Sequence, residues 1–216
     1  MQDFITHQQS RVNLYAFISR LLLMEVDKDL LEIIQNDPNM LAYLPNFETW
    51  EKRHKLSTDE LIEQELNVDY TNLFLLHAIP YESFYTREDQ MMETGGENPV
   101  LQFFNKYDFR VDLSIARAVS VDHIGIEAEF MYKLAQAQLE ALQEEDLEAA
   151  CEIAKIQKEF LEKHLLNFAP MYLLNVKSEA RTPLYFDVAD LALEFFLEDY
   201  EFLNKLITEK GCAYNS

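Results

Sequence analysis

The sequence predicts an all-α fold, a single compact domain of about seven to nine helices, and three observations support this prediction. The chain has 216 residues but only 4 glycines and 6 prolines, whereas all-β folds use these residues at their many turns. Leu, Glu, Ala and Gln are plentiful and β-branched residues are sparse, a balance that favours helix. Apolar residues recur at helical spacing along most of the chain. Because a chain of this length can bury a sizeable core, we expect one domain over residues 1–216.

Local signals place the helices of the N-terminal half. A first helix is expected over about residues 2–24, where apolar side chains follow helical spacing. Asp27 is suited to cap a second helix, which Pro38 closes. After a polar connector, Ser57 and Glu60 have the spacing of a capping box in front of another apolar pattern.

The stretch 77–97 loses helical periodicity and is expected to form a long loop between the two helical halves. It contains Pro80 and the aromatic residues Tyr81, Phe84 and Tyr85. Long loops inside compact domains are usually functional or disordered, and three aromatic residues argue against disorder. We therefore expect this loop to serve function.

The C-terminal half begins with a strong helix signal. Asn98-Pro99 combines an N-cap residue with proline at the first helical position. Ser120 or Asp122 is then suited to cap a helix that runs to about Gln143.

Two more helices complete the predicted fold. Asp146 is placed to begin the first of them, which Pro170 is expected to stop because proline breaks the helical hydrogen-bond ladder. Thr182-Pro183 repeats the signal of a cap followed by proline and starts a last long helix.

The charge of the chain limits its partners. A formal net charge of -21 repels phosphate backbones, so nucleic acid is not expected to bind. The same charge attracts cationic peptides, although strong acidity also keeps a protein in solution without any partner.

Three features predict a cytoplasmic protein that is not integral to a membrane. The start of the chain lacks the basic and apolar regions of a secretion signal. No apolar run approaches the roughly 20 residues that span a bilayer. Cys151 and Cys212 are not at motif spacing, and two isolated thiols suit a reducing compartment.

Recognisable catalytic motifs are missing from the sequence, so no catalytic residue, cofactor or metal is predicted. Glycines do not cluster into a phosphate-binding loop, and no Cys/His set has zinc spacing. His123 stands between Asp122 and Glu127, and carboxylates on both sides should help it to hold a proton. These three residues form either a capping cluster at a helix start or a ligand site, so a helical metal-dependent enzyme remains an alternative.

Three sets of short motifs stand in a characteristic order. They are 69–74 with 80–85, 121–127 with 129–131, and 164–166 with Phe168, Pro170 and 182–185. Over about residues 12–203, the chain resembles the TorD/DmsD family of redox-enzyme maturation chaperones.

This resemblance implies a compact all-helical cytoplasmic chaperone without catalytic activity. Its partners would be the twin-arginine signal peptide and the immature catalytic subunit of a molybdopterin-dependent oxidoreductase, of the dimethyl sulfoxide or trimethylamine N-oxide reductase type. The chaperone would assist cofactor insertion and hold back export until the enzyme is folded. Weak guanine-nucleotide binding is also implied, although the sequence shows no nucleotide motif. An assembly subunit that is retained in a redox complex remains a further alternative.

The resemblance also implies a binding site. The Asp-His pair of the family falls on Asp122 and His123, and its aromatic loop falls on 80–85. An arginine pair followed by an apolar stretch needs carboxylates beside an apolar groove. The candidate residues for binding the client are Asp69, Tyr70, Phe74, Pro80, Tyr81, Glu82, Ser83, Tyr85, Asp122, His123 and Glu127. For each aromatic residue among them, packing in the core is the alternative.

Overall fold

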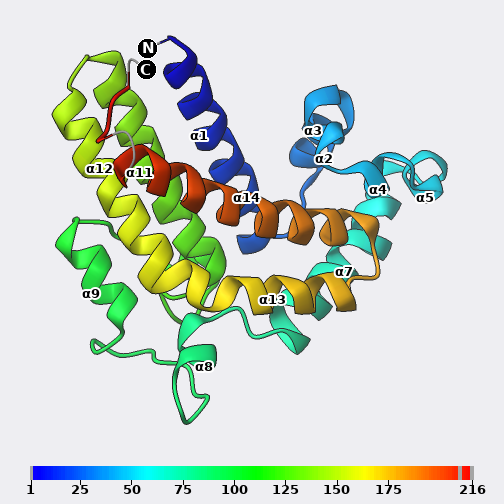
Figure 1. The fold of residues 1–216 in the computed structure, drawn as a ribbon. Coiled ribbons are helices and arrows are strands. Elements are labelled where there is room, and N and C mark those ends of the chain that lie inside the picture. The colour runs from blue at the N-terminus through cyan, green and yellow to red at the C-terminus, as the bar shows by residue number, and fades with distance from the viewer. Residues whose placement is uncertain (1, 209–210, 215–216) are drawn as a thin grey trace. The chain divides into compact units, whose positions relative to one another are not determined.

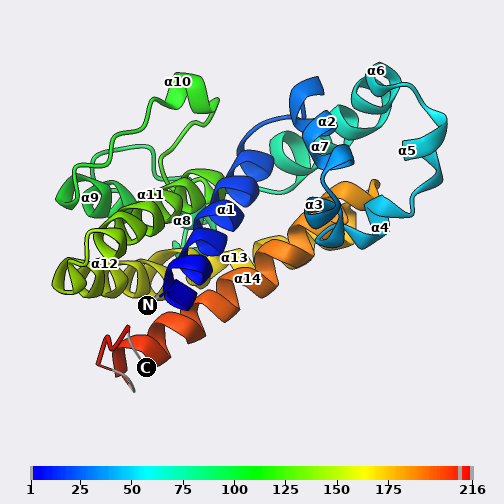
Figure 2. The same ribbon diagram turned by 90° about the horizontal axis from the view of Figure 1, so that it is seen from above.

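The computed structural model describes residues 2–208 and 211–214, and these residues form helices and no strand (Figures 1 and 2). The predicted all-α class is therefore confirmed. The long helical stretches are α1 (Gln2–Leu23), α2 (Lys28–Asn36), a continuous stretch over 58–77, α9 (Pro99–Lys106), α11 (Ile124–Gln143), a second continuous stretch over 147–179, and α14 (Pro183–Thr208).

Each continuous stretch combines α-helix with wider π-helical segments, labelled η. The first consists of α6 (Thr58–Glu60), η1 (Leu61–Leu66), α7 (Asn67–Tyr70) and η2 (Thr71–His77). The second consists of α12 (Leu147–Phe160), η3 (Leu161–Leu165) and α13 (Leu166–Glu179). The connectors between these stretches contain the short helices α3 (Pro38–Ala42), α4 (Pro45–Glu48), α5 (Glu51–Lys55), α8 (Glu82–Thr86) and α10 (Leu113–Ala116).

Contacts divide the chain into two compact units. Unit 1 comprises residues 1–23, 81–168 and 196–216, and unit 2 comprises residues 24–80 and 169–195. The predicted single domain over residues 1–216 stays a prediction.

In unit 1, α11 packs along both α1 and α12. Its apolar core includes Phe103, Phe104, Phe130 and Phe160, whose ring centroids lie 4.8–6.0 Å apart in the contacting pairs. Burying such large aromatic side chains contributes strongly to stability. This core supports α11, whose first turn carries Glu127 and whose N-cap is His123.

The core of unit 2 is also aromatic. Tyr70 and Phe74 pack against each other at 4.8 Å, and both lie within 6 Å of the ring of Tyr185. Phe74 also contacts Tyr172 on α13 at 6.5 Å. The three helical segments α7, η2 and α13 are thus held together with the start of α14 by aromatic packing.

Local capping signals predicted several helix starts correctly. Asp27 accepts a hydrogen bond from the backbone N–H of Leu30 at 2.8 Å, and Ser57 with Glu60 forms a complete capping box. Asn98 caps α9, and Asp146 caps α12. Each of these interactions joins residues close in sequence, which is why the sequence alone reveals them.

The prediction that Pro170 stops its helix is wrong, because α13 continues through it to Glu179. Proline removes one backbone hydrogen bond and costs about 3 kcal/mol inside a helix. However, Tyr172, Leu173 and Val176 beyond the proline are buried, and their burial offsets that cost.

The expected loop over 77–97 is only partly irregular. His77 ends η2, and residues 82–86 form the single-turn-length helix α8. The backbone N–H groups at the start of α8 have partners on the chain before α11, so tertiary contacts stabilise a turn that lacks helical periodicity in its sequence.

The cysteine prediction is also wrong, because Cys151 and Cys212 form a disulfide. Their Cα atoms lie 5.6 Å apart although 61 positions separate them in sequence. Such a pairing depends on how the chain folds back, which spacing alone does not reveal. Among the described residues, no helix combines the length and apolar character that crossing a membrane requires.

Candidate functional site

Two chain segments of unit 1 meet at the candidate site. Tyr81 and His123 form an isolated antiparallel bridge, and the backbone N–H of Glu82 donates to the carbonyl oxygen of Asp122 at 2.9 Å. The backbone N–H of Ser83 donates to Asp122 Oδ2 at 2.8 Å. The structure thus brings together the 80–85 and 121–127 motifs, as the prediction of one shared site requires.

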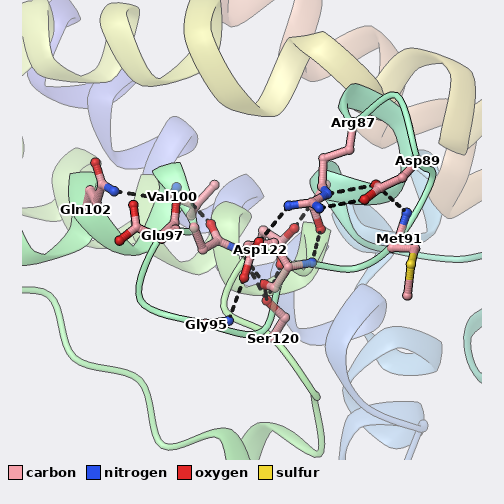
Figure 3. A network of polar contacts seen from close by, with 12 residues as sticks. Arg87, Asp89, Met91, Gly95, Glu97, Val100, Gln102, Ser120 and Asp122 are labelled. Carbon is pink, nitrogen blue, oxygen red and sulfur yellow. Dashed lines mark hydrogen bonds and ion pairs between the residues drawn. The ribbon is translucent and has the colours of Figure 1, made fainter.

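Asp122 extends this junction to a third segment, which Figure 3 shows from close by. The hydroxyl of Ser120 hydrogen bonds to Asp122 Oδ1 and lies 2.7 Å from the carbonyl oxygen of Glu93. Asn98 Nδ2 donates to the same carbonyl at 2.8 Å, and the backbone N–H of Glu93 donates to Ser83 Oγ at 2.9 Å. Asp122 is only 1% exposed, so its position in this network is fixed from several sides.

His123, rather than Ser120 or Asp122, caps α11. Its Nδ1 accepts a hydrogen bond from the backbone N–H of Gly125 at 3.0 Å. The expectation that neighbouring carboxylates help it to hold a proton is wrong. Burial lowers the pKa of His123 to about 4, although the charge of Asp122 opposes that shift. His123 is therefore neutral at pH 7, and a neutral ring nitrogen is able to accept the capping hydrogen bond.

Two more carboxyl groups lie inside unit 1 beside this junction. Glu82 Oε2 lies 3.1 Å from Nδ1 of His164, and both side chains are buried. Glu127 on the first turn of α11 is fully buried, and neither of its carboxyl oxygens meets hydrogen-bond geometry with another described group. Burial first, and then the charges of Glu82 and Asp122, raise the pKa of Glu127 well above its usual range. Glu127 is therefore protonated under conditions in which an exposed glutamate is charged.

A pocket of about 180 Å³ opens beside these residues within unit 1. Its charged lining is mostly acidic and comprises Glu82, Glu93, Glu97, Asp122 and Arg87. Arg87 donates to Glu93 Oε2 at 2.6 Å and forms two hydrogen bonds with Asp89, at 2.7 and 2.9 Å (Figure 3). The pocket therefore carries several acceptors at its wall and one resident guanidinium group.

The aromatic residues of the predicted loop have different environments. Tyr81 is buried, and its hydroxyl accepts a hydrogen bond from the backbone N–H of Val119 at 3.1 Å. Tyr85 is half-buried and lies 5.8 Å from Phe168, measured between ring centroids. Tyr81 thus helps to hold the site together, whereas Tyr85 is partly accessible.

The remaining predicted residues belong to unit 2. Asp69 accepts hydrogen bonds from the backbone N–H and the hydroxyl of Thr182, both at 2.7 Å. Tyr70 and Phe74 lie in the aromatic core, and Pro80 is buried at the end of the unit. Within unit 2, Asp69 therefore fixes the chain at the start of α14. A role for these four residues in client binding stays a prediction.

The sequence did not single out several residues that build the pocket. Glu93, Glu97 and Arg87 lie in the predicted loop, but no spacing pattern distinguishes them from other surface charges. The sequence indicates a role for Ser120 only as a helix cap, whereas its hydroxyl joins Asp122 to Glu93. The contacts of Glu93 with Ser83 and with Ser120 join residues 10 and 27 positions apart, so only the folded chain reveals them.

The alternative of a metal-dependent enzyme gains no support from the arrangement of His123, Glu127 and Asp122. In the part of the chain that the structure describes, no three His, Cys, Asp or Glu side chains are grouped to hold a metal ion. Nδ1 of His123 is already occupied by the helix cap.

Comparison with known proteins identifies the family. The family model described as "Nitrate reductase delta subunit" matches residues 37–173, which is more than half of the chain. The chain belongs to this family. Proteins named "Chaperone protein TorD" confirm the TorD/DmsD resemblance. The one from Vibrio atlanticus is 24% identical and covers 94% of this chain and 99% of its own. The one from Photobacterium profundum is 25% identical, with 94% and 98% covered. No solved structure matches the chain.

A third relative, from Vibrio cholerae, matches a smaller part of the chain. That "Chaperone protein TorD" is 27% identical over 164 residues, which cover 74% of this chain and 71% of the relative. All three relatives carry the name of a chaperone. For the first two, the match extends over almost the whole length of this chain and of the relative.

Proposed function

We propose that this chain is a cytoplasmic chaperone for a molybdopterin-dependent oxidoreductase of the dimethyl sulfoxide or trimethylamine N-oxide reductase type. It binds the twin-arginine signal peptide and the immature catalytic subunit, assists cofactor insertion and holds back export until the subunit is folded. The observation that carries this proposal is the acidic pocket of unit 1, which is built on two motifs of the TorD/DmsD family. Weak guanine-nucleotide binding stays a prediction.

The charge of the pocket suits an arginine side chain. Carboxylates of Glu93 and Glu97 line a space beside the buried Asp122. Guanidinium groups form short, charge-assisted hydrogen bonds with such acceptors. Arg87 already pairs with Glu93 at this wall, which supports the view that a guanidinium group fits there.

Apolar side chains beside the pocket suit the apolar part of a signal peptide. Met91 and Met92 precede Glu93 and are 64% and 42% exposed, and Val119 before Ser120 is 55% exposed. The hydrogen bond between Ser120 and Glu93 holds these two segments close together. Flexible methionine side chains adapt well to varied apolar partners, which is useful for binding an unfolded leader segment.

Asp122 and His123 act in this proposal by positioning the binding loops. Both are buried, and Asp122 joins the 80–85 segment to the chain before α11. Replacing Asp122 with alanine leaves the backbone N–H of Ser83 without its acceptor, which disorders the wall of the pocket. We therefore assign direct contact with arginine to Glu93 and Glu97.

The test is a calorimetric titration of the full chain with a synthetic twin-arginine leader peptide. The same peptide with both arginines replaced by glutamine is the control ligand. We expect Glu93→Gln and Glu97→Gln each to weaken binding about 10-fold, because each removes one charged acceptor. Glu144→Gln removes the same charge at an exposed turn after α11 and should leave binding unchanged. Equal affinity for both peptides would contradict the proposal.

A retained assembly subunit is the second candidate function. The matching family model carries the name of a reductase subunit, which favours this possibility. Purification of the mature, exported oxidoreductase decides between the two functions. A chaperone is absent from the finished enzyme, whereas an assembly subunit co-purifies with it in fixed proportion.

A further inference from the structure

The disulfide fastens the end of the chain to α12 within unit 1. Cys151 lies in the second turn of α12, and Cys212 follows the end of α14. The disulfide holds Cys212, in the C-terminal segment of residues 211–214, next to α12, with the Cα atoms of the two cysteines 5.6 Å apart. These are the only two cysteines in the sequence, so the pairing is unambiguous.

The backbone of the C-terminal segment turns sharply at the disulfide. Gly211 and Cys212 both have left-handed backbone conformations, with φ of 54° and 61°. The backbone N–H of Cys212 donates to the carbonyl oxygen of Leu206 at 2.9 Å. Cysteine rarely adopts a positive φ, so the segment depends on other contacts to stay in this conformation.

Tyr214 provides a second attachment point. Its ring is 1% exposed and lies 5.5 Å from the ring of Phe4. Its hydroxyl accepts a hydrogen bond from Gln138 Nε2 at 3.3 Å. Gln138 also accepts a hydrogen bond from Arg11 at 2.9 Å, so the C-terminal segment is linked to the buried polar network of unit 1.

Both cysteines are half-buried rather than enclosed in the core, as reaction with a small thiol or disulfide reagent requires. A reducing compartment keeps most protein thiols reduced, and disulfides that persist there are usually redox-responsive. This step of the argument depends on the cytoplasmic location given under the proposed function.

We propose that the disulfide between Cys151 and Cys212 forms and breaks reversibly, and we call it the redox clasp. It attaches the C-terminal segment to α12 when oxidised and releases the segment when reduced. Glutathione disulfide is the oxidant in this exchange. One cysteine thiolate attacks it and releases one glutathione thiolate, which leaves a mixed disulfide on the protein. The second cysteine thiolate then displaces the second glutathione. Two protein thiols are oxidised, and one glutathione disulfide is reduced to two glutathione molecules.

Opening the clasp should release the C-terminal segment and lower stability. A crosslink between residues this far apart restricts the unfolded chain strongly, and its loss in a protein of this size lowers the melting temperature by roughly 5–10 °C. Hydrogen exchange of the Cys212 amide should accelerate at least 10-fold, because the turn loses one of its two attachment points.

The experiment equilibrates the full chain in buffers of graded glutathione to glutathione disulfide ratio. Free thiols are then trapped with a polyethylene glycol maleimide and counted from the gel shift, and exchange of a peptide covering residues 206–214 is measured by mass spectrometry. We expect one cooperative change from zero to two labels, accompanied by the faster exchange. Cys151→Ser and Cys212→Ser should both exchange fast at every ratio.

Three results would overturn the proposal. The thiols could remain fully reactive in glutathione disulfide alone, which would mean that the clasp does not close. The disulfide could resist a large excess of reduced glutathione, which would make it a permanent crosslink. Exchange over residues 206–214 could be equal in the two states, which would mean that the disulfide does not hold the segment. None of these measurements involves a client peptide, so they leave the proposed chaperone function untouched.

Discussion

Two groups of buried polar side chains in unit 1 differ in whether a buried carboxyl group has an oppositely charged partner. Arg11 forms hydrogen bonds with both carboxylate oxygens of Asp199, at 2.5 and 2.9 Å, and with glutamine side chains around it. Tyr15 also donates to Asp199, at 2.7 Å. Glu127, in contrast, has Glu82 and Asp122 as electrostatic neighbours, and no basic group of the described residues pairs with its carboxyl.

This difference separates a structural network from the candidate site. A buried ion pair with satisfied hydrogen bonds fixes helices relative to each other. A buried carboxyl group without a matching cation costs stability and keeps its proton. Such costs are typical of sites that serve function, and Glu127 belongs to the motif next to the acidic pocket.

The largest expected effect comes from breaking the matched network. Asp199→Ala leaves Arg11 buried without its counter-ion and should lower the free energy of unfolding by about 3–5 kcal/mol. Urea denaturation followed by circular dichroism measures this change. Glu201→Ala removes a carboxylate from an exposed pair with Lys205 on the same helix and should change stability by less than about 0.5 kcal/mol. Similar effects of the two variants would show that the network is not structural.

The next largest effect concerns the approach of α11 to α1. A Cβ atom on Gly125 would lie 2.9 Å from Cβ and 3.1 Å from Cα of Leu23. Gly125→Ala should therefore cost about 1–3 kcal/mol through overpacking. Gly96→Ala is the matched control, because nothing lies within 4 Å of its added Cβ. If both variants were equally stable, the first turn of α11 would be free to shift, and the candidate site would be less rigid than described.

Replacing the unmatched carboxyl should stabilise the protein. The pKa of Glu127 is raised in the folded state from its usual 4.5. The free energy of unfolding is therefore highest below pH 4.5 and falls as the pH rises from 4.5 toward the folded pKa. Glu127→Gln cannot titrate and should be about 1–2 kcal/mol more stable than the parent at pH 7, but nearly equal at pH 4. Chemical denaturation at both pH values tests this sign. Destabilisation at pH 7 would mean that the carboxyl group has a favourable partner.

The smallest expected effect tests whether the pH dependence of stability comes from titration of His123, whose capping role asparagine can also fill. Its folded pKa of about 4 lies below the usual 6.5, so the unfolded chain takes up the proton first. Stability should therefore fall as the pH drops from 6.5 toward 4. Asparagine also caps helices well, and His123→Asn should match the parent at pH 7 and exceed it by about 1 kcal/mol at pH 6. An identical pH dependence of both proteins would rule out His123 as its source.

The sequence predicted features that depend on neighbouring residues better than those that depend on the fold. The caps at Asp27, Asn98 and Asp146 were correct because each bonds to a backbone group two or three residues away. The pairing of Cys151 with Cys212 and the continuation through Pro170 depend on distant packing. At the candidate site, the motifs identified Asp122 and Glu82, whereas the position of Glu93 in the pocket depends on how the loops fold.

The antiparallel bridge between Tyr81 and His123 has a consequence for engineering this family. It makes residues 81–83 and 120–123 one transplantable module, because Asp122 provides acceptors for both Glu82 and Ser83. A chimaera that exchanges only one of the two segments with a relative separates donors from their acceptors. Transfer of client preference between such chaperones should therefore require both segments to move together.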